Sequence, residues 1–333
     1  MISVTDKSYA IELLSSAIRS AIVAGEGKQF YVSDLASIEG RSLAYLAGET
    51  WKLDAYRDYD LGIGSDLYVL AYSMAFNTPI EKIGKPERQL GKVLELALGY
   101  GGGVGAFITF SLVNGVDLDE LARNTYKDLS DWAVNGAYDW WKESVKRGKT
   151  YNLAEKTFIT CDAIKRIWRA NNKNIAQFWY NLENAAKQVI SEKRKDAIKV
   201  GKVSIDMRGA WMRIKLPGGR FLSYPGATVA SNKIRYLGLN MYSRKWCNLS
   251  TYGGKLSENI TQAFAADVFF YGLMEAERRG YYPVLAVHDE GVTEGEGDLS
   301  IEGLNEALSI APSWATGLPM AAEGFKGVRY KKG

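Results

Sequence analysis

The 333-residue sequence contains few of the residues on which several common kinds of site depend. It has one histidine, His288, and two cysteines, Cys161 and Cys247. A metal site built from several histidines, or a serine or cysteine hydrolase with its own histidine base, is therefore nearly excluded. Two cysteines cannot form a disulfide framework, so we expect the protein to work in a reducing compartment, the cytoplasm.

The sequence also lacks a targeting signal and a long apolar run. The first residues, MISVTDKSYAIELL, do not show the basic-then-apolar pattern of a signal peptide. Even the stretch AFAADVFFYGLM is interrupted by Asp267 and is shorter than the ~18 residues of a membrane span. With 47% hydrophobic and 24% charged residues, the composition is that of a globular protein, for which we expect no membrane partner.

The net charge of +4 conceals an uneven distribution of charge along the chain. Residues 165–255 contain 19 Lys and Arg but only 4 Asp and Glu, a segment charge of +15 that leaves −11 for the rest. A basic segment interleaved with aromatic residues favours a surface that binds a polyanion. The alternative is an ordinary solvated surface that happens to be basic. The aromatic residues are Trp168, Trp179, Trp211, Tyr236, Tyr242 and Trp246.

The spacing of apolar residues predicts an α+β fold. A strand over 28–35 stands between helices over 11–24 and 37–48. After Lys199 the short alternating runs KVSIDM, WMRIKL and GRFLSY are typical of antiparallel strands, and YYPVLAVHDEGVTE indicates a strand, a tight turn and a second strand. We therefore expect an antiparallel sheet built from distant segments, with a helical insertion between residues 48 and about 194. Further helices are predicted over 66–76, 86–98, 119–146, 155–170, 172–193, 256–279 and 299–310.

Two acidic positions follow predicted strands that look central and buried. Asp34 ends the first strand, and Asp289 with Glu290 follows VLAVH. A buried carboxylate is costly unless something binds it, and two cations held by carboxylates form the two-metal arrangement of nucleotidyl transfer. Oxygen ligands alone indicate Mg²⁺. The alternative is that Asp34 caps the next helix and Asp289 is an ordinary turn residue.

A second candidate element is the predicted helix in PERQLGKVLELALGYGGG. Arg88 and Lys92 are four residues apart and so project from one face, and Leu96 and Tyr100 continue the same row. Two cations followed by flat or apolar side chains suit the phosphates and the base of a nucleoside triphosphate. The alternative is an exposed helix with two ordinary surface cations.

The glycines after this helix allow a different interpretation of its function. Residues 101–106, GGGVGA, fit the GxGxxA fingerprint of dinucleotide-binding proteins. That fingerprint needs a preceding strand, whereas the preceding segment here has a helical period. The glycines more simply allow a tight turn and leave room for a substrate or template backbone. A dinucleotide-dependent enzyme remains the weaker alternative.

Three segments taken together resemble motifs A, B and C of family A DNA polymerases, the DNA polymerase I superfamily. DLASIEGRSLAYLAGE resembles motif A, RQLGKVLELALGYG motif B, and VHDE motif C. Their order and the long gaps between them agree as well. LPGGRFLSY, YGGKLSENITQAFAAD and the tail WATGLPMAAEGFKGVRYKK are similar to bacteriophage-type members. The resemblance extends from about residue 10 to the C-terminus.

The resemblance implies a role for each residue that matches a motif. Asp34 and Asp289 would hold two Mg²⁺ ions, for which Mn²⁺ would substitute, and Glu290 would support them. Arg88 and Lys92 would bind the incoming dNTP, with Lys92 assisting the leaving group. Leu96, Tyr100 and Glu39 would complete the dNTP site, where Glu39 would exclude a 2′-hydroxyl. The expected contacts to DNA are Gln262, His288, Gly101 and Arg41.

The sequence departs from the family pattern in three places. The usual aromatic residue and glutamine of motif A are replaced by Leu35 and Ser37, and the usual aromatic residue of motif B by Leu96. Base stacking and sugar discrimination would differ accordingly. The metal ligands and the phosphate-binding cations are all present, which argues against an inactive homologue, although a non-catalytic nucleic-acid-binding module remains an alternative.

The implied organisation is a polymerase palm with an inserted helical fingers domain. We expect an N-terminal helix over 1–27, the first part of the palm over 28–48, fingers over 49–194 and the second part of the palm over 195–333. The thumb and the 3′–5′ exonuclease have no counterpart in the sequence. It is therefore expected to be one half of a split DNA polymerase that acts on a primer-template in the cytoplasm, with the thumb supplied by a second subunit.

Overall fold

The computed structural model describes residues 17–330, and the chain divides into two compact units. Residues 1–39 and 263–333 form one unit, here called the terminal unit, and residues 40–262 form the central unit. Most of the helix predicted over 11–24 lies outside the described residues or is not helical, because only residues 17–20 of it are described as helix. The terminal unit thus joins segments from both ends of the sequence, as predicted for the main sheet.

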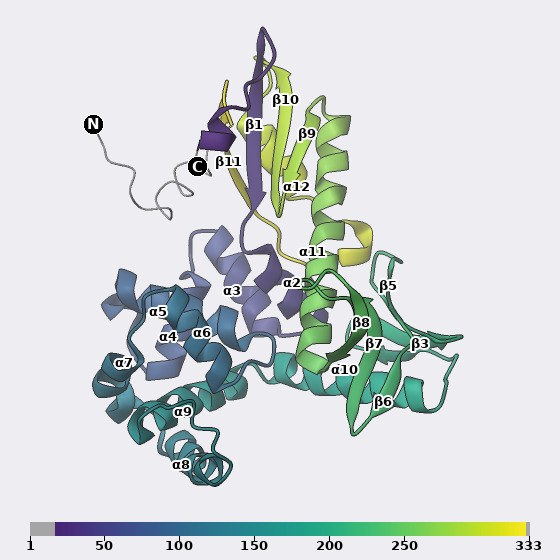
Figure 1. The fold of residues 1–333 in the computed structure, drawn as a ribbon. Helices are drawn as coiled ribbons and strands as arrows, with labels where there is room; N and C mark the ends of the chain where they lie inside the picture. The colour runs from purple at the N-terminus through teal and green to yellow at the C-terminus, as the bar shows by residue number, and fades with distance from the viewer. Residues whose placement is uncertain (1–16, 331–333) are drawn as a thin grey trace, which may run out of the picture. The chain divides into compact units, whose positions relative to one another are not determined.

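The terminal unit is built on a four-stranded sheet of order β11–β1–β10–β9, in which all neighbouring strands are antiparallel (Figure 1). Its strands are β1 (Lys28–Leu35), β9 (Tyr282–Val287), β10 (Glu290–Glu296) and β11 (Ala322–Gly327). The predicted strand over 28–35 and the predicted strand, turn and strand around VHDE are confirmed. The sequence did not predict β11, which pairs with β1 along six residues.

Helices cover one face of this sheet. The Oγ of Ser33 in β1 donates a hydrogen bond to Asn305 Oδ1 in α12 (Ile301–Leu308) at 2.6 Å. A Cβ atom on Gly291 in β10 would lie 2.8 Å from a side chain of α11 (Gly253–Arg278), so this helix packs closely against the same face. Because side chains alternate between the two faces of a strand, the residues next to Ser33 and Gly291 point to the opposite face.

The burial of β9 differs from the prediction. The segment VLAV was expected to be a central, buried strand, but β9 is an edge strand whose residues 282–286 are all exposed. The central positions belong to β1 and β10, and β10 begins at Glu290. An apolar run is compatible with either position, since periodicity alone does not reveal which neighbours a strand has. The prediction of a buried strand before Asp289 was therefore wrong.

The central unit begins with a bundle of helices. Most helices predicted for residues 66–193 are confirmed within two residues, and none of the helices in residues 17–330 is both long and apolar enough to cross a membrane. Its helices are α3 (Thr50–Asp60), α4 (Leu67–Phe76), α5 (Lys85–Leu98), α6 (Val104–Val113), α7 (Leu118–Thr125), α8 (Asp131–Lys146), α9 (Glu155–Asn171) and α10 (Lys173–Ser191), and α2 (Ile38–Ala47) precedes them.

Two features of the bundle depart from the sequence prediction. The single helix expected over 119–146 is interrupted, because Leu129 and Ser130 adopt extended conformations between a short 3₁₀ turn and α8. Leu129 is buried at this break, so tertiary packing outweighs the helical pattern. Helices α3 and α6 were not predicted. In α3 the buried positions include Lys52 and Tyr56, which do not form an ordinary apolar stripe.

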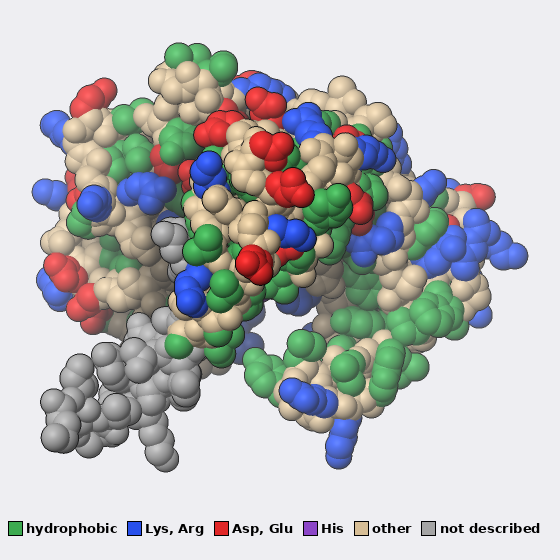
Figure 2. Space-filling model, turned by 90° about the horizontal axis from the view of Figure 1, so that it is seen from above, with side chains coloured by type: hydrophobic (Ala, Val, Ile, Leu, Met, Phe, Trp, Pro, Cys, Tyr) green, Lys and Arg blue, Asp and Glu red, His purple; other side chains and the backbone are tan. Residues whose placement is uncertain are grey.

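Two further antiparallel sheets complete the central unit. One contains β2 (Ile198–Val200), β3 (Val203–Arg208), β4 (Trp211–Lys215) and β5 (Phe221–Pro225) in sequence order, which confirms three predicted strands. Lys and Arg side chains gather at the right-hand edge of Figure 2, the side on which β3 and β5 lie in Figure 1. The other sheet, of β6 (Thr228–Ala230), β7 (Lys233–Leu239) and β8 (Trp246–Thr251), was not predicted.

The boundaries between the compact units differ from the domain boundaries that the resemblance implied. Residues 195–262 group with the helices of the central unit, although they were assigned to the second part of the palm. The sheet that carries the acidic motif residues contains only strands from residues 28–35 and 282–327. Palm and fingers therefore remain functional assignments from motif order, while the compact units are defined by packing.

Candidate active site

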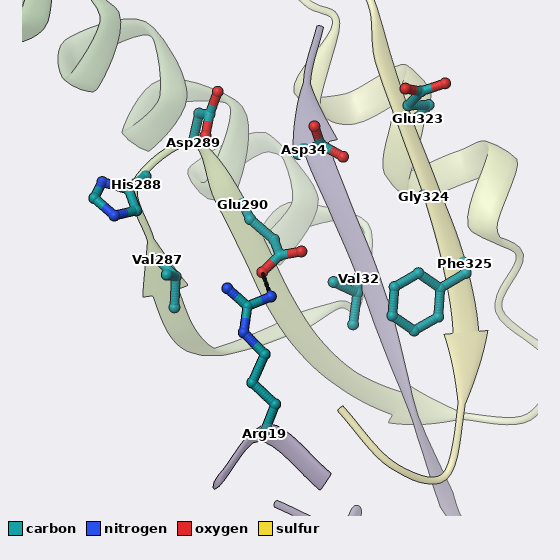
Figure 3. Close-up of a pocket in the computed structure, with 10 residues that line it drawn as sticks. All are labelled: Arg19, Val32, Asp34, Val287, His288, Asp289, Glu290, Glu323, Gly324 and Phe325. Carbon is teal, nitrogen blue, oxygen red and sulfur yellow. Dashed lines mark hydrogen bonds and ion pairs between the residues drawn. The ribbon is translucent and has the colours of Figure 1, made fainter. Parts of the chain in front are cut away.

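Three carboxylates from three neighbouring strands lie side by side in the terminal unit. Asp34 in β1 is paired directly with Glu290 in β10 and with Glu323 in β11. Directly opposed residues of antiparallel strands project from the same face, here the one opposite to α12. Asp289 occupies the turn immediately before β10, and its backbone oxygen accepts a hydrogen bond from the Leu35 amide at 3.2 Å. The sheet therefore gathers four acidic residues around the end of β1, as Figure 3 shows.

These carboxylates line a pocket of about 580 Å³. The predicted residues Asp34, His288, Asp289 and Glu290 are all part of its lining, so the structure brings motifs A and C together. His288 occupies the turn with a φ of 58°, a left-handed conformation that is uncommon for a residue other than glycine. The remaining lining residues are Arg19, Val32, Val287, Glu323, Gly324 and Phe325.

The electrostatics of the pocket favour a bound cation. The pKa of Asp34 is raised, first by its burial and then by the negative charges of Asp289, Glu323 and Glu290. Like charges on directly opposed strand positions destabilise a sheet, and a divalent cation would remove that repulsion. Asp34 and Asp289 supply the oxygen donors that Mg²⁺ prefers, so the residues present fit the expected ion chemically.

Glu290 has protein partners in this pocket. Its Oε1 accepts a hydrogen bond from Arg19 Nη1 at 3.4 Å and another from the Tyr330 hydroxyl. Burial, followed by this bond to Glu290, raises the pKa of Tyr330 to about 12, so the tyrosine remains a proton donor. Within residues 17–330 no group of three or more His, Cys, Asp or Glu side chains is arranged as a ready metal site. Asp34 and Asp289 are thus the better candidates for ligands, with Glu290 held by neighbours.

The sequence analysis missed Glu323, Arg19 and Tyr330. One feature of the sequence could have indicated a strand with an acidic site residue at Glu323. In the short segment AEGFKG a glycine directly follows the acid. A Cβ atom on Gly324 would lie 2.1 Å from the Val32 carbonyl oxygen, so only glycine allows β11 to approach β1 so closely. Arg19 and Tyr330 carry no comparable sequence signal, since one arginine and one tyrosine in terminal segments match many roles.

The second candidate element, α5, belongs to the central unit. Glu87 accepts a hydrogen bond from the Gly84 amide at 3.0 Å, and Pro86 stands in the first turn, which fixes where the helix begins. Its apolar face is buried, while Arg88, Lys92 and Leu96 stay at least partly exposed along one line. The predicted row of side chains is therefore present, and Tyr100 follows the end of the helix.

The two cations of α5 have different surroundings. Arg88 Nη2 forms an ion pair with Asp66 Oδ2 at 2.8 Å, and its guanidinium lies 5.2 Å from the centre of the Tyr68 ring. For Lys92 the structure shows no ion pair with any residue from 17 to 330. An anionic ligand at Arg88 would have to compete with Asp66, whereas the exposed part of Lys92 carries no such ion pair among residues 17–330.

A buried charge pair fixes α5 to the rest of the bundle. Lys52 Nζ lies 2.5 Å from Glu95 Oε2, and the Trp168 indole donates to the other Glu95 oxygen at 2.8 Å. The Lys52 side chain is only 2% exposed. These contacts set the rotation of α5 about its axis and so determine that Arg88, Lys92 and Leu96 face outward. None of these contacts was predicted from the sequence.

Arg169 holds the glycine-rich loop after α5 through hydrogen bonds to the backbone of the loop. Gly101 has a φ of 76°, and Arg169 Nη2 donates to the carbonyl oxygens of Gly101 and Gly102 at 3.3 and 3.1 Å. The loop joins α5 to α6, a context that does not match the strand before a dinucleotide-binding loop. A Cβ atom on Gly254 would lie 2.1 Å from the Tyr100 carbonyl oxygen, so the YGG sequence at the start of α11 serves close packing.

The remaining predicted DNA and sugar contacts have mixed outcomes. Arg41 is 1% exposed, and its guanidinium makes two hydrogen bonds to Asp60, at 2.6 and 2.7 Å, and lies over the Tyr56 ring. Its burial argues for a structural role and against the expected contact with DNA. Glu39 lies in the first turn of α2 and is partly exposed, and Gln262 is exposed on α11. Their roles stay predictions.

Comparison with known proteins agrees with the motifs. No family model matches the chain. A protein of Bacillus phage SP02 described as a DNA polymerase is 33% identical over 330 residues, which cover 96% of this chain and 44% of that protein. The polymerase domain of Pol1 from M. smegmatis, solved in complex with DNA primer-template and dNTP, matches with a TM-score of 0.55 at 15% identity. The resemblance to the family A DNA polymerases is confirmed.

The two comparisons carry different weight. The structural match covers 99% of this chain and 44% of the Pol1 chain, and at 15% identity it supports the α+β polymerase fold. The phage protein supports the family, but the chain spans less than half of the length of that relative. Activity, substrates and partners of the whole relatives are therefore matters for proposal.

Proposed function

We propose that the chain is the catalytic core of a DNA-directed DNA polymerase, which transfers dNMP from a dNTP to a primer 3′-hydroxyl. The observation that carries this proposal is the position of Asp34 beside Asp289, with Glu290 and Glu323 on the two flanking strands. A structural role alone would not favour so many like charges on one face, because they repel one another.

Asp34 and Asp289 would hold the metal ions of the reaction. When bound there, two Mg²⁺ ions, or Mn²⁺ in their place, would lower the pKa of the primer 3′-hydroxyl and neutralise the triphosphate. Glu290, fixed by Arg19 and Tyr330, would contribute negative charge to the same pocket without changing position. Its two partners thus make it a supporting residue.

The row of side chains on α5 would bind the incoming nucleotide. Arg88 and Lys92 would hold the phosphates, and Lys92 would place a positive charge beside the leaving pyrophosphate. Leu96 and Tyr100 would lie along the nascent base pair, with Gly101 next to the template. Glu39 would exclude ribonucleotides by its position below the sugar, and Gln262 and His288 would contact the primer terminus.

A second polypeptide is the finer part of this proposal. The phage relative contains more than twice the sequence that aligns with this chain. We propose that a second polypeptide would supply a thumb and a proofreading exonuclease. Without such a subunit, we expect weak binding to primer-template and short products.

Primer extension with the Asp289→Asn variant tests the catalytic proposal. The wild type should incorporate dNTPs in a reaction that requires Mg²⁺, assayed alone and with the polypeptide that corresponds to the rest of the phage relative. The variant should lose incorporation while it still binds primer-template. Glu277→Gln, an exposed change on α11 outside the pocket, is the matched control and should leave incorporation unchanged.

The same assay decides between the enzyme and its main alternative. A wild type that binds DNA but shows no metal-dependent incorporation, even with the second polypeptide, would indicate a non-catalytic polymerase-like module. Processive synthesis by this chain alone would contradict the need for a second subunit. The two results are independent, so each part of the proposal can fail separately.

A further inference from the structure

The sheet of β6, β7 and β8 in the central unit has one open face. Alternate residues of β7 are exposed, from Lys233 through Arg235 and Leu237 to Leu239. The β7–β8 register places Trp246 opposite Leu239 and two small polar residues opposite Leu237 and Arg235. Opposed residues share a face, so these side chains form one continuous surface, here called the β7 face.

The β7 face and its surroundings carry charge of one sign. Residues 207–257 contain nine Lys and Arg and not a single Asp or Glu. The four cations of the β7–β8 hairpin are Lys233, Arg235, Arg244 and Lys245, and the structure shows no ion pair for any of them within residues 17–330. A stretch of 51 residues without an acid is unusual in a chain that is 24% charged, and it fits a polyanionic partner.

The turn between β7 and β8 presents aromatic side chains to solvent. Tyr242 is 100% exposed and Trp246 is 71% exposed. The turn is ordered by Asn240, whose Oδ1 accepts hydrogen bonds from the amides of Tyr242 and Ser243 at 3.0 and 2.9 Å. A third bond, from the Asn240 backbone amide to the Lys245 backbone oxygen at 2.9 Å, closes the hairpin. The backbone of the turn that carries the two aromatic residues is therefore ordered by hydrogen bonds.

We propose that the β7 face binds a segment of single-stranded nucleic acid, with bases against Tyr242 and Trp246 and phosphates on the four hairpin cations. Aromatic side chains next to cations on an open sheet face are a common means of holding unpaired bases. The bases of a duplex are stacked on one another and leave no free face for these rings. β7 is seven residues long, so the face extends for roughly 20 Å, enough for a few nucleotides.

Charge favours nucleic acid over the other occupants of such a surface. A second copy of the chain would bring its own cations to the same place in a symmetric contact, and these would repel. An acidic protein would satisfy the cations but would not need flat rings exposed at the turn. A single strand of DNA or RNA satisfies both features, since it supplies phosphates and unpaired bases at regular spacing.

Binding of a labelled oligothymidylate of about 12 nucleotides, followed by fluorescence anisotropy, tests this site. The experiment uses the full 333-residue chain without Mg²⁺ or dNTP, so a failure of the catalytic proposal would not change its result. We expect Tyr242→Ala combined with Trp246→Ala to weaken binding about tenfold or more, because each stacked base contributes substantially. Arg235→Ala should weaken binding and reduce its dependence on salt by about one counterion.

Matched controls separate this surface from general effects. Trp132→Ala combined with Tyr180→Ala removes two equally large aromatic rings that are about half exposed elsewhere in the central unit. Lys149→Ala removes an exposed cation outside the hairpin. Both controls should bind the oligonucleotide as the wild type does. Circular dichroism of every variant verifies that it is folded.

Three results would overturn the proposal. The first would be that the wild type fails to bind the oligonucleotide, or that the Tyr242 and Trp246 double variant binds it with an affinity within about twofold of that of the wild type. The second would be that the double variant loses as much affinity for a blunt duplex as for the single strand, which would mean that the face binds the phosphates of a duplex. The third would be that the double substitution changes only the molar mass measured by light scattering, which would identify the face as a contact between copies of the chain.

Discussion

Two antiparallel sheets in this chain each carry a cluster of like charges, acidic in one sheet and basic in the other. On β11, β1 and β10, Asp34 has a glutamate directly opposite on each side. On β6, β7 and β8, Arg235 and Lys233 stand among exposed apolar and aromatic side chains with no acid nearby in the sequence. Both sheets are antiparallel, but only β7 leaves every second side chain exposed, whereas residues 30–33 of β1 are all buried. The difference lies in which ligand would relieve the repulsion.

This difference teaches how to recognise binding surfaces in a folded chain. Where charge is only structural, the central unit pairs it: Lys52 with Glu95, Arg41 with Asp60, and Asp162 with Lys165 and Arg166. Where like charges gather, the protein loses stability that a ligand of the opposite charge restores. A cation would do so at the carboxylates, and a nucleic acid strand at the β7 face.

Neutralising the centre of the acidic face gives the largest expected effect. Asp34→Asn should lower the rate of dNTP incorporation by about a thousandfold, because a metal ligand contributes several kcal/mol to the transition state. The same change should raise the melting temperature, since it removes the charge that its neighbours repel. Single-nucleotide incorporation and thermal unfolding measure the two effects. A variant that loses both activity and stability would contradict the inference that repulsion among these carboxylates destabilises the folded protein.

Breaking a structural pair in the central unit should have the opposite effect on stability. Lys52→Met leaves the largely buried Glu95 with the Trp168 indole but without its cation, so the free energy of unfolding should fall by about 3–5 kcal/mol. Urea unfolding followed by circular dichroism measures the loss. The control is Lys142→Met, which removes an exposed pair with Asp139 and should lower the free energy of unfolding far less than Lys52→Met does. Equal losses would show that burial does not distinguish the pairs.

A smaller change separates packing from charge in the central unit. Gly254→Ala would place a Cβ atom 2.1 Å from the Tyr100 carbonyl oxygen, so the backbone must move. We expect a loss of about 1–3 kcal/mol in urea unfolding with no change in the charge of either face. Gly209→Ala is a control with open space around it, where only the strained φ of 60° opposes the side chain. A tolerated Gly254→Ala would mean that the start of α11 is not closely packed.

The smallest expected effect concerns the two thiols, which differ in burial. Cys161 in α9 is 1% exposed, and burial raises its pKa to about 12. It should stay unmodified by a thiol reagent in the folded protein, because the thiolate is the reactive form. Cys247 in β8 is partly exposed and should react. Labelling of the wild type and of Cys247→Ser checks this: about one reactive thiol per chain should disappear in the variant.

The motifs could be found from the sequence because their residues are local. Arg88, Lys92 and Leu96 are related by the period of one helix, and Asp289 and Glu290 are neighbours in the chain. The strands around Asp34 also show their alternation directly. The joining of these distant segments into one antiparallel sheet was also predicted, from the alternation of apolar residues in each segment.

The partners of those residues could not be found in the same way. Glu323 lies opposite Asp34 because β11 returns to β1 across 286 residues of intervening sequence. The interruption at Leu129 and the exposure of β9 likewise depend on which surfaces meet. Arg41 matched a motif arginine, yet its two bonds to Asp60 place it inside the fold.

The sequence by itself determined the chemical inventory of this protein: one acidic motif at each end of the chain, a helix with two cations, and a basic segment without acids between residues 207 and 257. Only the tertiary structure decided which charges are paired and which face solvent. Side-chain period fixes the face of a strand or helix, but burial depends on what packs against that face. Lys52 is therefore a buried structural cation and Arg235 an exposed one, although nothing in their local sequence distinguishes them.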